Sequence, residues 1–410
     1  MLTRLWNLFG RRPFKINSES NRPKRRQSQR TLRCESLERR EMHAVIAGES
    51  VVNSSSQVMY DRYQAATASA PDGRSVVVWT HRQGLNDTDI RAQLYDRTGK
   101  KAGAEISVAA SIRNERNPDV SMDNAGNFVV TWEYEVSFIN SDIQAARFTN
   151  LGVVKGSIIT VASLTSKEFD PTIASDARGN FVVAWTREYS VYDLDIKARM
   201  FRDDGIAVAE AFTVANSSTM NEMRADVARA PDGRFAISYQ IGDIESNPDI
   251  MLKLYSGSGL ELSTLSIATG SAVQTHARVA MDSNANIVVV WRESARGNSD
   301  IKARSITSSG ILGDIKTVVS STDEKIESDV AMKRDGKSYV VTHYNLNRQT
   351  IHVTELTLAG AVRRTERVAS LSPGDAVAIT FGDASNYSIV YSKFVGNERF
   401  KLFRRRGRLT

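Results

Sequence analysis

Residues 118–132, PDVSMDNAGNFVVTW, contain the pattern that decides the fold. The ring-bearing residue at the end of this stretch recurs at spacings of 53, 53, 54, 52, 52 and 48 residues, as Trp79, Trp132, Trp185, Tyr239, Trp291, His343 and Tyr391. A period this regular indicates several copies of one supersecondary unit rather than one irregular globule. The chain therefore reads as seven copies of that unit.

Each copy contains four short runs that are rich in β-branched and aromatic residues. In the copy around Trp132 these runs are 118–122, 128–132, 142–148 and 158–162. Asp, Asn and Gly separate the runs, and Gly or Asn supplies the positive φ that a tight hairpin turn needs. The pattern predicts four β-strands in each copy, and no helix-period stretch interrupts them.

Second strands such as 181–185 (FVVAW) and 287–291 (IVVVW) are apolar on both faces. Both faces must then be covered, which indicates that one four-stranded unit packs on the next. Repeats of this length are typical of β-propellers, whereas a right-handed β-solenoid has a far shorter repeat. We predict an all-β, seven-bladed β-propeller with blades at about 62–110, 111–163, 164–216, 217–269, 270–320, 321–370 and 371–410.

The two ends of the repeat region indicate how the ring closes. The last copy runs through 399–403 to Gly407, read as its turn glycine, and lacks a fourth strand. Residues 47–54 resemble 103–110, the fourth strand of the first copy. We therefore predict that the strand 45–54 completes the seventh blade, which ties the termini together and removes free sheet edges.

Composition and charge limit the function classes. The chain is 41% hydrophobic and 25% charged, as ordinary globular proteins are, and no apolar run is long enough to predict a transmembrane segment. The net charge of +7 arises from residues 1–40, which carry twelve Lys or Arg against three Glu, so the repeats are nearly neutral. A basic run at 404–408 is read as a solvated strand edge, and no nucleic-acid partner is predicted.

Residues 1–44 lack the repeat and are predicted to form a basic, disordered leader or export segment. Residues 34–44, CESLERREMHA, resemble the LExLExRxLLA segment of exported and surface proteins of planctomycete bacteria, with Cys34 and Met42-His43 in place of leucines. The resemblance implies export, with the leader removed near Ala44. The alternative is a basic tail without such a role. Cys34 is the only cysteine, so no intramolecular disulfide can form.

The repeats themselves resemble the DxxGxFVVxW…DIxAR repeats of bacterial extracellular proteins, which often form propeller-like arrays. Trp132, Asp142, Ile143, Ala146 and Gly152 carry this resemblance. It implies a secreted or cell-surface location for the repeat region.

No catalytic motif, cofactor motif or metal-ligand spacing is present in the sequence, so no catalytic residue, cofactor or metal is predicted. In each of the first five copies one aspartate precedes or opens the third strand: Asp89, Asp142, Asp195, Asp249 and Asp300. A ring of these carboxylates would suit Ca²⁺, but a blade width separates them, which favours a structural role. The recurring Glu133, Glu188 and Glu293 are likewise read as residues of a shared edge rather than as catalytic acids.

The loops that join second to third strands vary in length and content: 133–141, 187–194, 240–248 and 292–299. Variable loops on a rigid scaffold commonly carry binding residues. Aromatic and Arg side chains suit a sugar or protein ligand, which gives the candidates Tyr134, Phe138, Arg187, Tyr189, Tyr192 and Arg296.

The sequence thus predicts a monomeric, secreted or cell-surface binding or scaffolding module for protein or carbohydrate. One alternative is a carbohydrate-active hydrolase or lyase with acidic residues at the propeller channel. The other is a structural component of the cell envelope. An enzyme should bring acid and base residues from different blades together with shifted pKa values, whereas a binding module needs only an aromatic or charged patch.

Overall fold

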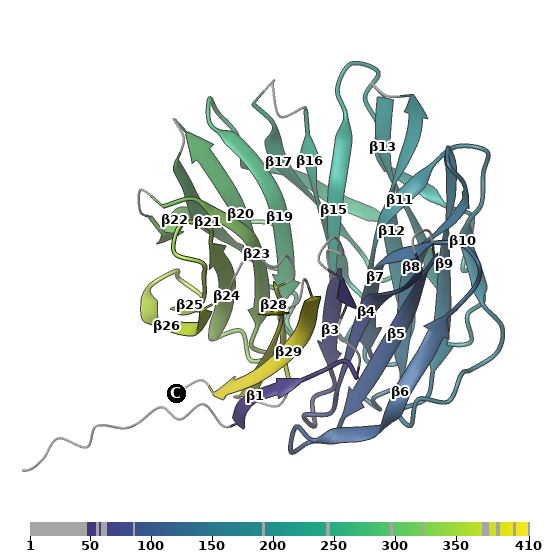
Figure 1. Cartoon of the computed structure of the whole chain (residues 1–410). Helices are drawn as coiled ribbons and strands as arrows, with labels where there is room; N and C mark the ends of the chain where they lie inside the picture. Colours follow the sequence, from purple (N-terminus) through teal and green to yellow (C-terminus); the bar gives the residue numbers. More distant parts are fainter. Residues whose placement is uncertain are drawn as a thin grey trace, which may run out of the picture. The chain divides into compact units, whose positions relative to one another are not determined.

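The computed structural model describes residues 47–408 except 55–56, 59–63, 85–86, 191–192, 243–246, 296–297, 321–322, 371–376, 383–385 and 397–398. The predicted leader at 1–44 and the candidates Tyr192 and Arg296 lie outside the described residues. The described part is all-β, and seven antiparallel sheets form a β-propeller, as predicted (Figure 1). No helix that could cross a membrane occurs in it.

Six blades each consist of four strands that are consecutive in the chain. The first three are β3 (Ala65–Ser69), β4 (Ser75–Gly84), β5 (Asp87–Tyr95), β6 (Lys101–Ala109); β7 (Glu115–Met122), β8 (Phe128–Ser137), β9 (Asn140–Phe148), β10 (Ile159–Ala162); and β11 (Glu168–Ser175), β12 (Phe181–Ser190), β13 (Asp193–Phe201), β14 (Phe212–Ala215). The next three are β15 (Glu222–Arg229), β16 (Phe235–Ile241), β17 (Asp249–Tyr255), β18 (Glu261–Ala268); β19 (Val273–Met281), β20 (Ile287–Ala295), β21 (Asn298–Ile306), β22 (Leu312–Val319); and β23 (Lys325–Met332), β24 (Ser338–Asn345), β25 (Thr350–Thr357), β26 (Val362–Ser370).

The seventh blade combines both ends of the described chain. It consists of β27 (Val377–Phe381), β28 (Asn386–Gly396), β29 (Arg399–Arg408) and β1 (Ala47–Val51), while the short β2 (Gln57–Val58) also pairs with β29. The backbone N–H of Val52 donates to the Leu402 carbonyl at 2.8 Å, and the Leu402 N–H donates to Asn53 Oδ1 at 2.9 Å. The predicted closure by an N-terminal strand is therefore confirmed.

The core lies between neighbouring blades rather than within one. Trp132 is fully buried in a cluster that joins apolar residues of the first two blades. Rings at the start of the second strand and the end of the third stack on each other, as in Phe128–Phe148 at 4.9 Å between centroids. Apolar burial and ring stacking explain why the aromatic period is so regular, since each blade needs the same bulk at the same place.

The turns after the first strands explain the recurrence of Asp and Gly. Asp176 Oδ1 accepts the backbone N–H groups of Arg178 and Asn180 at 2.9 and 3.0 Å, and its Oδ2 accepts the Asn180 amide at 2.8 Å. Gly179 has a φ of 92°, and a Cβ there would lie 3.2 Å from Asp123 Oδ2 of the preceding blade. Glycine is therefore required by both the backbone and the neighbouring turn.

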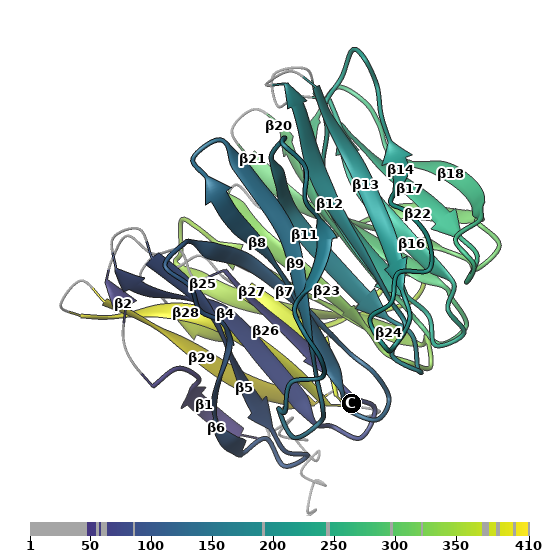
Figure 2. The same ribbon diagram turned by 90° about the vertical axis from the view of Figure 1, so that its right-hand side faces the viewer.

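These turns lie on one face of the ring, called here the turn face. The loops between second and third strands and the links between blades lie on the opposite face, the loop face. Figure 2 shows the propeller from the side, with the loops that join second to third strands toward the upper left.

The seam between the last and first blades corrects two sequence interpretations. The prediction of a solvated edge at Arg404 is wrong, because Arg404 is only 2% exposed and donates to Ser75 Oγ at 2.8 Å and Ser388 Oγ at 2.6 Å. The prediction of a turn at Gly407 is also wrong, because Gly407 lies within β29 opposite Tyr387. A Cβ at Gly407 would meet the Tyr387 ring, so glycine is needed there for ring packing.

Candidate binding site in the central channel

The innermost strand of each blade lines the central channel, and several of these strands contain the same kink. Four of them have a non-glycine residue with positive φ at the equivalent position: Asn117 (52°), Asp170 (49°), Arg224 (55°) and His276 (57°). The pairing with the second strand shifts register at each kink. Positive φ is uncommon outside glycine, and strained backbone of this kind is frequent at functional sites.

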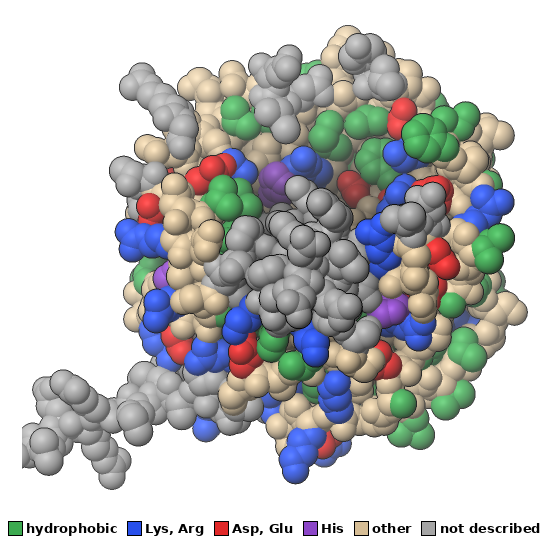
Figure 3. All heavy atoms as spheres, in the orientation of Figure 1, with side chains coloured by type: hydrophobic (Ala, Val, Ile, Leu, Met, Phe, Trp, Pro, Cys, Tyr) green, Lys and Arg blue, Asp and Glu red, His purple; other side chains and the backbone are tan. Residues whose placement is uncertain are grey.

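The side chains at this position differ from blade to blade and form a polar arc. We call Gln64, Asn117, Asp170, Arg224 and His276, from the first five blades, the mouth arc. The Asn117 backbone N–H donates to Gln64 Oε1 at 2.6 Å, and the Asn117 amide nitrogen lies 3.3 Å from Asp170 Oδ1. Arg224 Nη1 lies 3.0 Å from His276 Nδ1. The loop face shows cationic, anionic and His side chains around its middle (Figure 3).

A buried carboxylate lies directly behind the arc. Glu133 on β8 is 2% exposed and accepts the Asn117 amide at 2.9 Å through Oε2. Its Oε1 accepts from Arg116 Nε, also at 2.9 Å. The Asn117 nitrogen thus lies between two carboxylates, those of Glu133 and Asp170. The sequence interpretation of Glu133 as an edge residue missed this contact with the channel.

The arc has an acidic half around Asp170 and a basic half around Arg224. Asp170 is exposed to the channel, and desolvation by the surrounding channel walls raises its pKa. The charge of Glu133 raises this pKa further, while arginines such as Arg224 oppose the shift. Burial lowers the pKa of His276 to about 3, with further lowering by Arg224, Arg278 and Arg292. His276 is therefore neutral near pH 7 and accepts a hydrogen bond from Arg224 through one ring nitrogen.

Deeper in the channel, three aspartates join consecutive blades. Each accepts a backbone N–H of the following inner strand: Asp119 from Ile173 at 2.9 Å, Asp226 from Val279 at 2.7 Å and Asp329 from Ile379 at 2.8 Å. An inner strand is the edge of its sheet, so its channel-facing N–H groups lack a partner strand. These carboxylates satisfy that need and are architectural.

The three aspartates are half-buried. Burial raises the pKa of Asp119 to about 6 and that of Asp329 to about 7, and burial also raises the pKa of Asp226. Thr172 Oγ1 lies 3.1 Å from Asp119 and 3.3 Å from Asp226. Since one hydroxyl carries one proton, a proton on either carboxyl would complete both hydrogen bonds.

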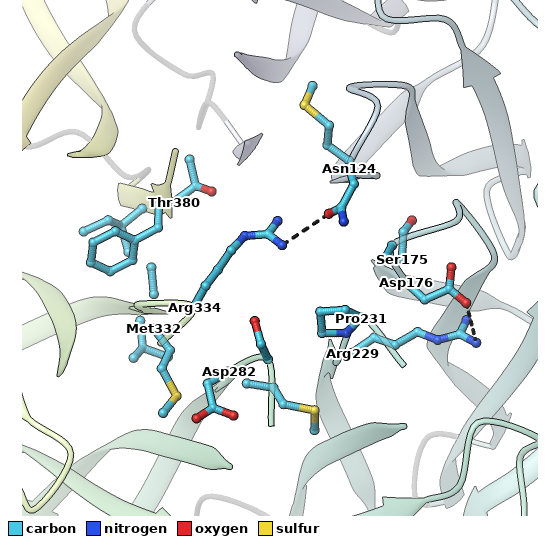
Figure 4. A pocket seen from close by; sticks show the side chains of 17 residues that line it. Asn124, Ser175, Asp176, Arg229, Pro231, Asp282, Met332, Arg334 and Thr380 are labelled. Atoms are coloured by element: carbon cyan, nitrogen blue, oxygen red, sulfur yellow. Dashed lines mark hydrogen bonds and ion pairs between the residues drawn. The ribbon is translucent and has the colours of Figure 1, made fainter. Parts of the chain in front are cut away.

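At the turn face the channel ends in a cavity of about 230 Å³ (Figure 4). Arg334, in the turn between β23 and β24, extends toward Asn124 of the second blade and donates to its Oδ1 at 3.2 Å. Arg229 lies in the same wall and pairs with Asp176 at 3.4 Å. The channel is thus polar at both ends. In the cavity at the turn face, apolar side chains lie between the polar groups.

The candidates predicted from the variable loops lie apart from the mouth arc. Tyr134 packs partly buried against the core of the first two blades, and Phe138 is 96% exposed in the β8–β9 hairpin. The Arg187 guanidinium lies 4.1 Å from the centroid of the Tyr189 ring. Arg187 and Tyr189 are the one contacting pair that the structure shows among the described candidates, and whether any candidate binds a ligand stays a prediction.

Sequence reasoning missed the mouth arc because its side chains do not repeat. Its signal is a polar residue of changing type directly before Pro or Ala in the first strand, as in Asn117-Pro118, Asp170-Pro171, Arg224-Ala225 and His276-Ala277. The arc residues recur at the same position of each copy but change in residue type. The turn residues recur both in position and in residue type. That contrast could have identified the arc without a structure.

No family model and no curated protein sequence matches the chain. Among solved structures, an ulvan lyase bound to -[GlcA(1-4)Rha3S]- is similar with a TM-score of 0.53, 11% identity and coverage of 85% of this chain and 95% of that one. A protein of unknown function from Dyadobacter fermentans has a TM-score of 0.52, 10% identity and coverage of 72% and 95%. An α-L-arabinofuranosidase of Fusarium graminearum in complex with arabinobiose has a TM-score of 0.50, 10% identity and coverage of 72% and 93%. At these identities the likeness shows the fold alone.

Proposed function

We propose that this protein is a carbohydrate-binding propeller whose site is the mouth arc. The observation that carries the proposal is the arc itself, in which equivalent positions in five blades, kinked in four of them, carry five different polar side chains. Architecture alone would favour the same residue at every copy, as the turns do. Side-chain diversity on a constant backbone is the arrangement expected of a binding surface on a rigid scaffold.

The arc offers both donors and acceptors, which sugar hydroxyls require. Asn117 and Gln64 present amides, Asp170 presents carboxylate oxygens, and Arg224 presents a guanidinium. The basic half, with Arg224 beside the neutral His276, suits a carboxylate-bearing sugar through charge-assisted hydrogen bonds. The lyase and arabinofuranosidase named above hold sugars in propellers of similar fold, which supports the choice of carbohydrate over protein as the ligand.

The location is part of the proposal. We infer a secreted or cell-surface protein that acts as a monomer, from the resemblance of residues 34–44 to export segments and of the repeats to those of extracellular proteins. Planctomycete-type export and removal of the leader near Ala44 rest on that resemblance. N-terminal sequencing of the mature protein tests the cleavage site.

A carbohydrate-active hydrolase or lyase is the second candidate, and the pair of carboxylates around Asn117 favours it. Glu133 and Asp170 lie 2.9 and 3.3 Å from the same amide nitrogen, and desolvation by the channel walls raises the pKa of Asp170. Retaining glycosidases place two carboxyls about 5–5.5 Å apart, with one held protonated. An Asp170→Asn variant that still binds a glycan but no longer cleaves it would support this candidate.

The full-length protein should be screened on an array of neutral and uronate-containing glycans beside Arg224→Ala and His276→Ala. We expect glycan binding that both variants lose, with uronate-containing glycans preferred. Arg202→Ala is the matched control, because Arg202 lies in the β13–β14 turn on the turn face, half-exposed and paired with Asp204 at 3.0 Å. Glycan binding that survives both arc variants, or no glycan binding by the wild type, would refute the proposed site.

A further inference from the structure

The chamber at the turn face contains a feature that the repeat does not require. At the position that follows the turn Asp or its equivalent, the described blades have Pro71, Asn124, Ala177, Pro231, Ser283 and Arg334. Arg334 is the charged residue of this set. The Arg334 backbone makes the same contact between neighbouring blades as other turns do: the Ser283 N–H donates to the Arg334 carbonyl at 3.1 Å. The turn therefore needs the Arg334 backbone, and its side chain is free to serve another purpose.

The Arg334 guanidinium is a cation whose one described partner is a neutral amide. It donates to Asn124 Oδ1 at 3.2 Å, from the sixth blade to the second. The carboxylates nearby are already engaged: Asp176 pairs with Arg229 at 3.4 Å, and Asp282 accepts N–H groups from Asn284 and Asn286. A guanidinium has five N–H donors, and the described residues account for one of those of Arg334.

Desolvation acts on this cation without compensation. Burial lowers the pKa of Arg334, and no neighbouring carboxylate in the described chain opposes that shift. A partly desolvated charge is costly unless it gains an ionic partner. An anion that entered the chamber would recover that cost.

The wall also carries apolar side chains, which lie among polar residues such as Ser175, Asp282 and Thr380. Met122, Met281, Met332 and Phe381 line the same cavity of about 230 Å³. A water molecule occupies about 30 Å³ of liquid, so the chamber has room for a small organic molecule. Methionine side chains adapt to ligand shape, and they favour contact with carbon rather than with a fully hydrated ion.

We propose that the turn-face chamber binds a small organic carboxylate, with the oxyanion on Arg334 and the carbon skeleton on the methionines. Arg334 then holds its ligand by a charge-assisted pair, which Asn124 keeps aimed across the channel. This site lies at the opposite end of the channel from the mouth arc and does not depend on the glycan site. A soluble carboxylate on one face and a glycan on the other would be bound independently.

Butyrate, acetate, butyramide and inorganic phosphate should be titrated into the full-length protein by calorimetry. We expect saturable binding of butyrate, binding at least 10-fold weaker for acetate and phosphate, and none for butyramide. Arg334→Gln should weaken butyrate at least 10-fold, and Arg334→Lys should weaken it less. Arg178→Gln, which removes an exposed charge from a neighbouring turn, is the matched control and should bind butyrate as the wild type does.

Thermal melts of each variant establish that it is folded, since the Arg334 backbone contact survives the substitution. Failure of butyrate to bind the folded wild type, or equal binding by Arg334→Gln and wild type, would overturn the proposal. Phosphate that binds as tightly as butyrate would overturn the role of the methionines. Glycan-array binding by Arg334→Gln should be unchanged, so failure here is distinguishable from failure of the glycan proposal.

Discussion

The two mouths of the channel are built on opposite principles. At the loop face, one kinked backbone position carries Asn117, Asp170, Arg224 or His276, so the backbone repeats and the side chains do not. At the turn face, the same Asp and Asn hydrogen bonds recur in the second, third and fifth blades. The difference teaches that residues which repeat hold the ring together, whereas residues that depart from the repeat are the candidates for binding.

The largest effect should come from opening the ring. Deletion of residues 45–56 removes β1 and the buried Val52, leaving Leu402 of β29 without its partner. We expect the melting temperature to fall by on the order of 10 °C or more, because every blade depends on its neighbours. Differential scanning calorimetry measures this. A deletion variant that melts as the wild type does would show that β1 contributes no closure.

Breaking the seam at one residue should cost less. Arg404→Ala leaves the hydroxyls of Ser75 and Ser388 without their buried donor and removes the guanidinium that lies 4.1 Å from the Tyr95 ring centroid. We expect a loss of about 2–4 kcal/mol in the free energy of unfolding, measured by urea denaturation.

Arg408→Ala provides the control for the seam, because Arg408 is exposed on the same strand. Its effect should stay within about 0.5 kcal/mol. Equal stabilities for the two variants would mean that the buried guanidinium adds nothing to closure.

Between the two mouths, the channel aspartates should make stability depend on pH. The folded pKa of Asp329 is about 7, above the ordinary value near 4, so the folded state binds more protons between these values. The contribution of Asp329 to the free energy of unfolding therefore falls as pH rises from about 4 to about 7. Asn at this position keeps an oxygen for the Ile379 N–H and does not titrate, so Asp329→Asn should gain melting temperature relative to wild type across that window.

Melts of wild type and Asp329→Asn at several pH values isolate this one group from the others that titrate in the same range. A difference in melting temperature between wild type and Asp329→Asn that stays constant from pH 4 to pH 7 would contradict the raised pKa. Asp119→Asn should give a similar but smaller trend, because its folded pKa is about 6.

The smallest effects should come from the exposed loop aromatics. Phe138 projects into solvent, and Tyr189 is half-exposed under Arg187. Ala at either position should change the free energy of unfolding by no more than about 0.5 kcal/mol. If the mouth arc is the glycan site, the same variants should change glycan affinity less than two-fold. A larger loss would move the site outward to the variable loops.

Much of the fold could be predicted because the forces behind it act locally and repeat. The buried Trp132 and the turn glycine Gly179 each answer a need that every blade shares, so their period is visible in the sequence. Closure was predictable as well, since a missing fourth strand at one end matched a surplus strand at the other. These are consequences of composition and order along the chain.

The seam and the candidate site could not be predicted in the same way. A basic run such as 404–406 resembles a solvated edge, and only the ring brings Ser75 and Tyr95 onto Arg404. The kink at Arg224 has no glycine to mark it. Its importance depends on neighbours from other blades, which lie about 50 residues away in the sequence and carry different side chains.

The most direct test of the account is the affinity of one glycan, the strongest on the array, for wild type, Arg224→Ala and Tyr189→Ala, measured by titration calorimetry. The account predicts a loss of at least 10-fold for Arg224→Ala and less than two-fold for Tyr189→Ala, with unchanged melting temperatures for both. The opposite ranking, with affinity lost in Tyr189→Ala and kept in Arg224→Ala, would contradict it.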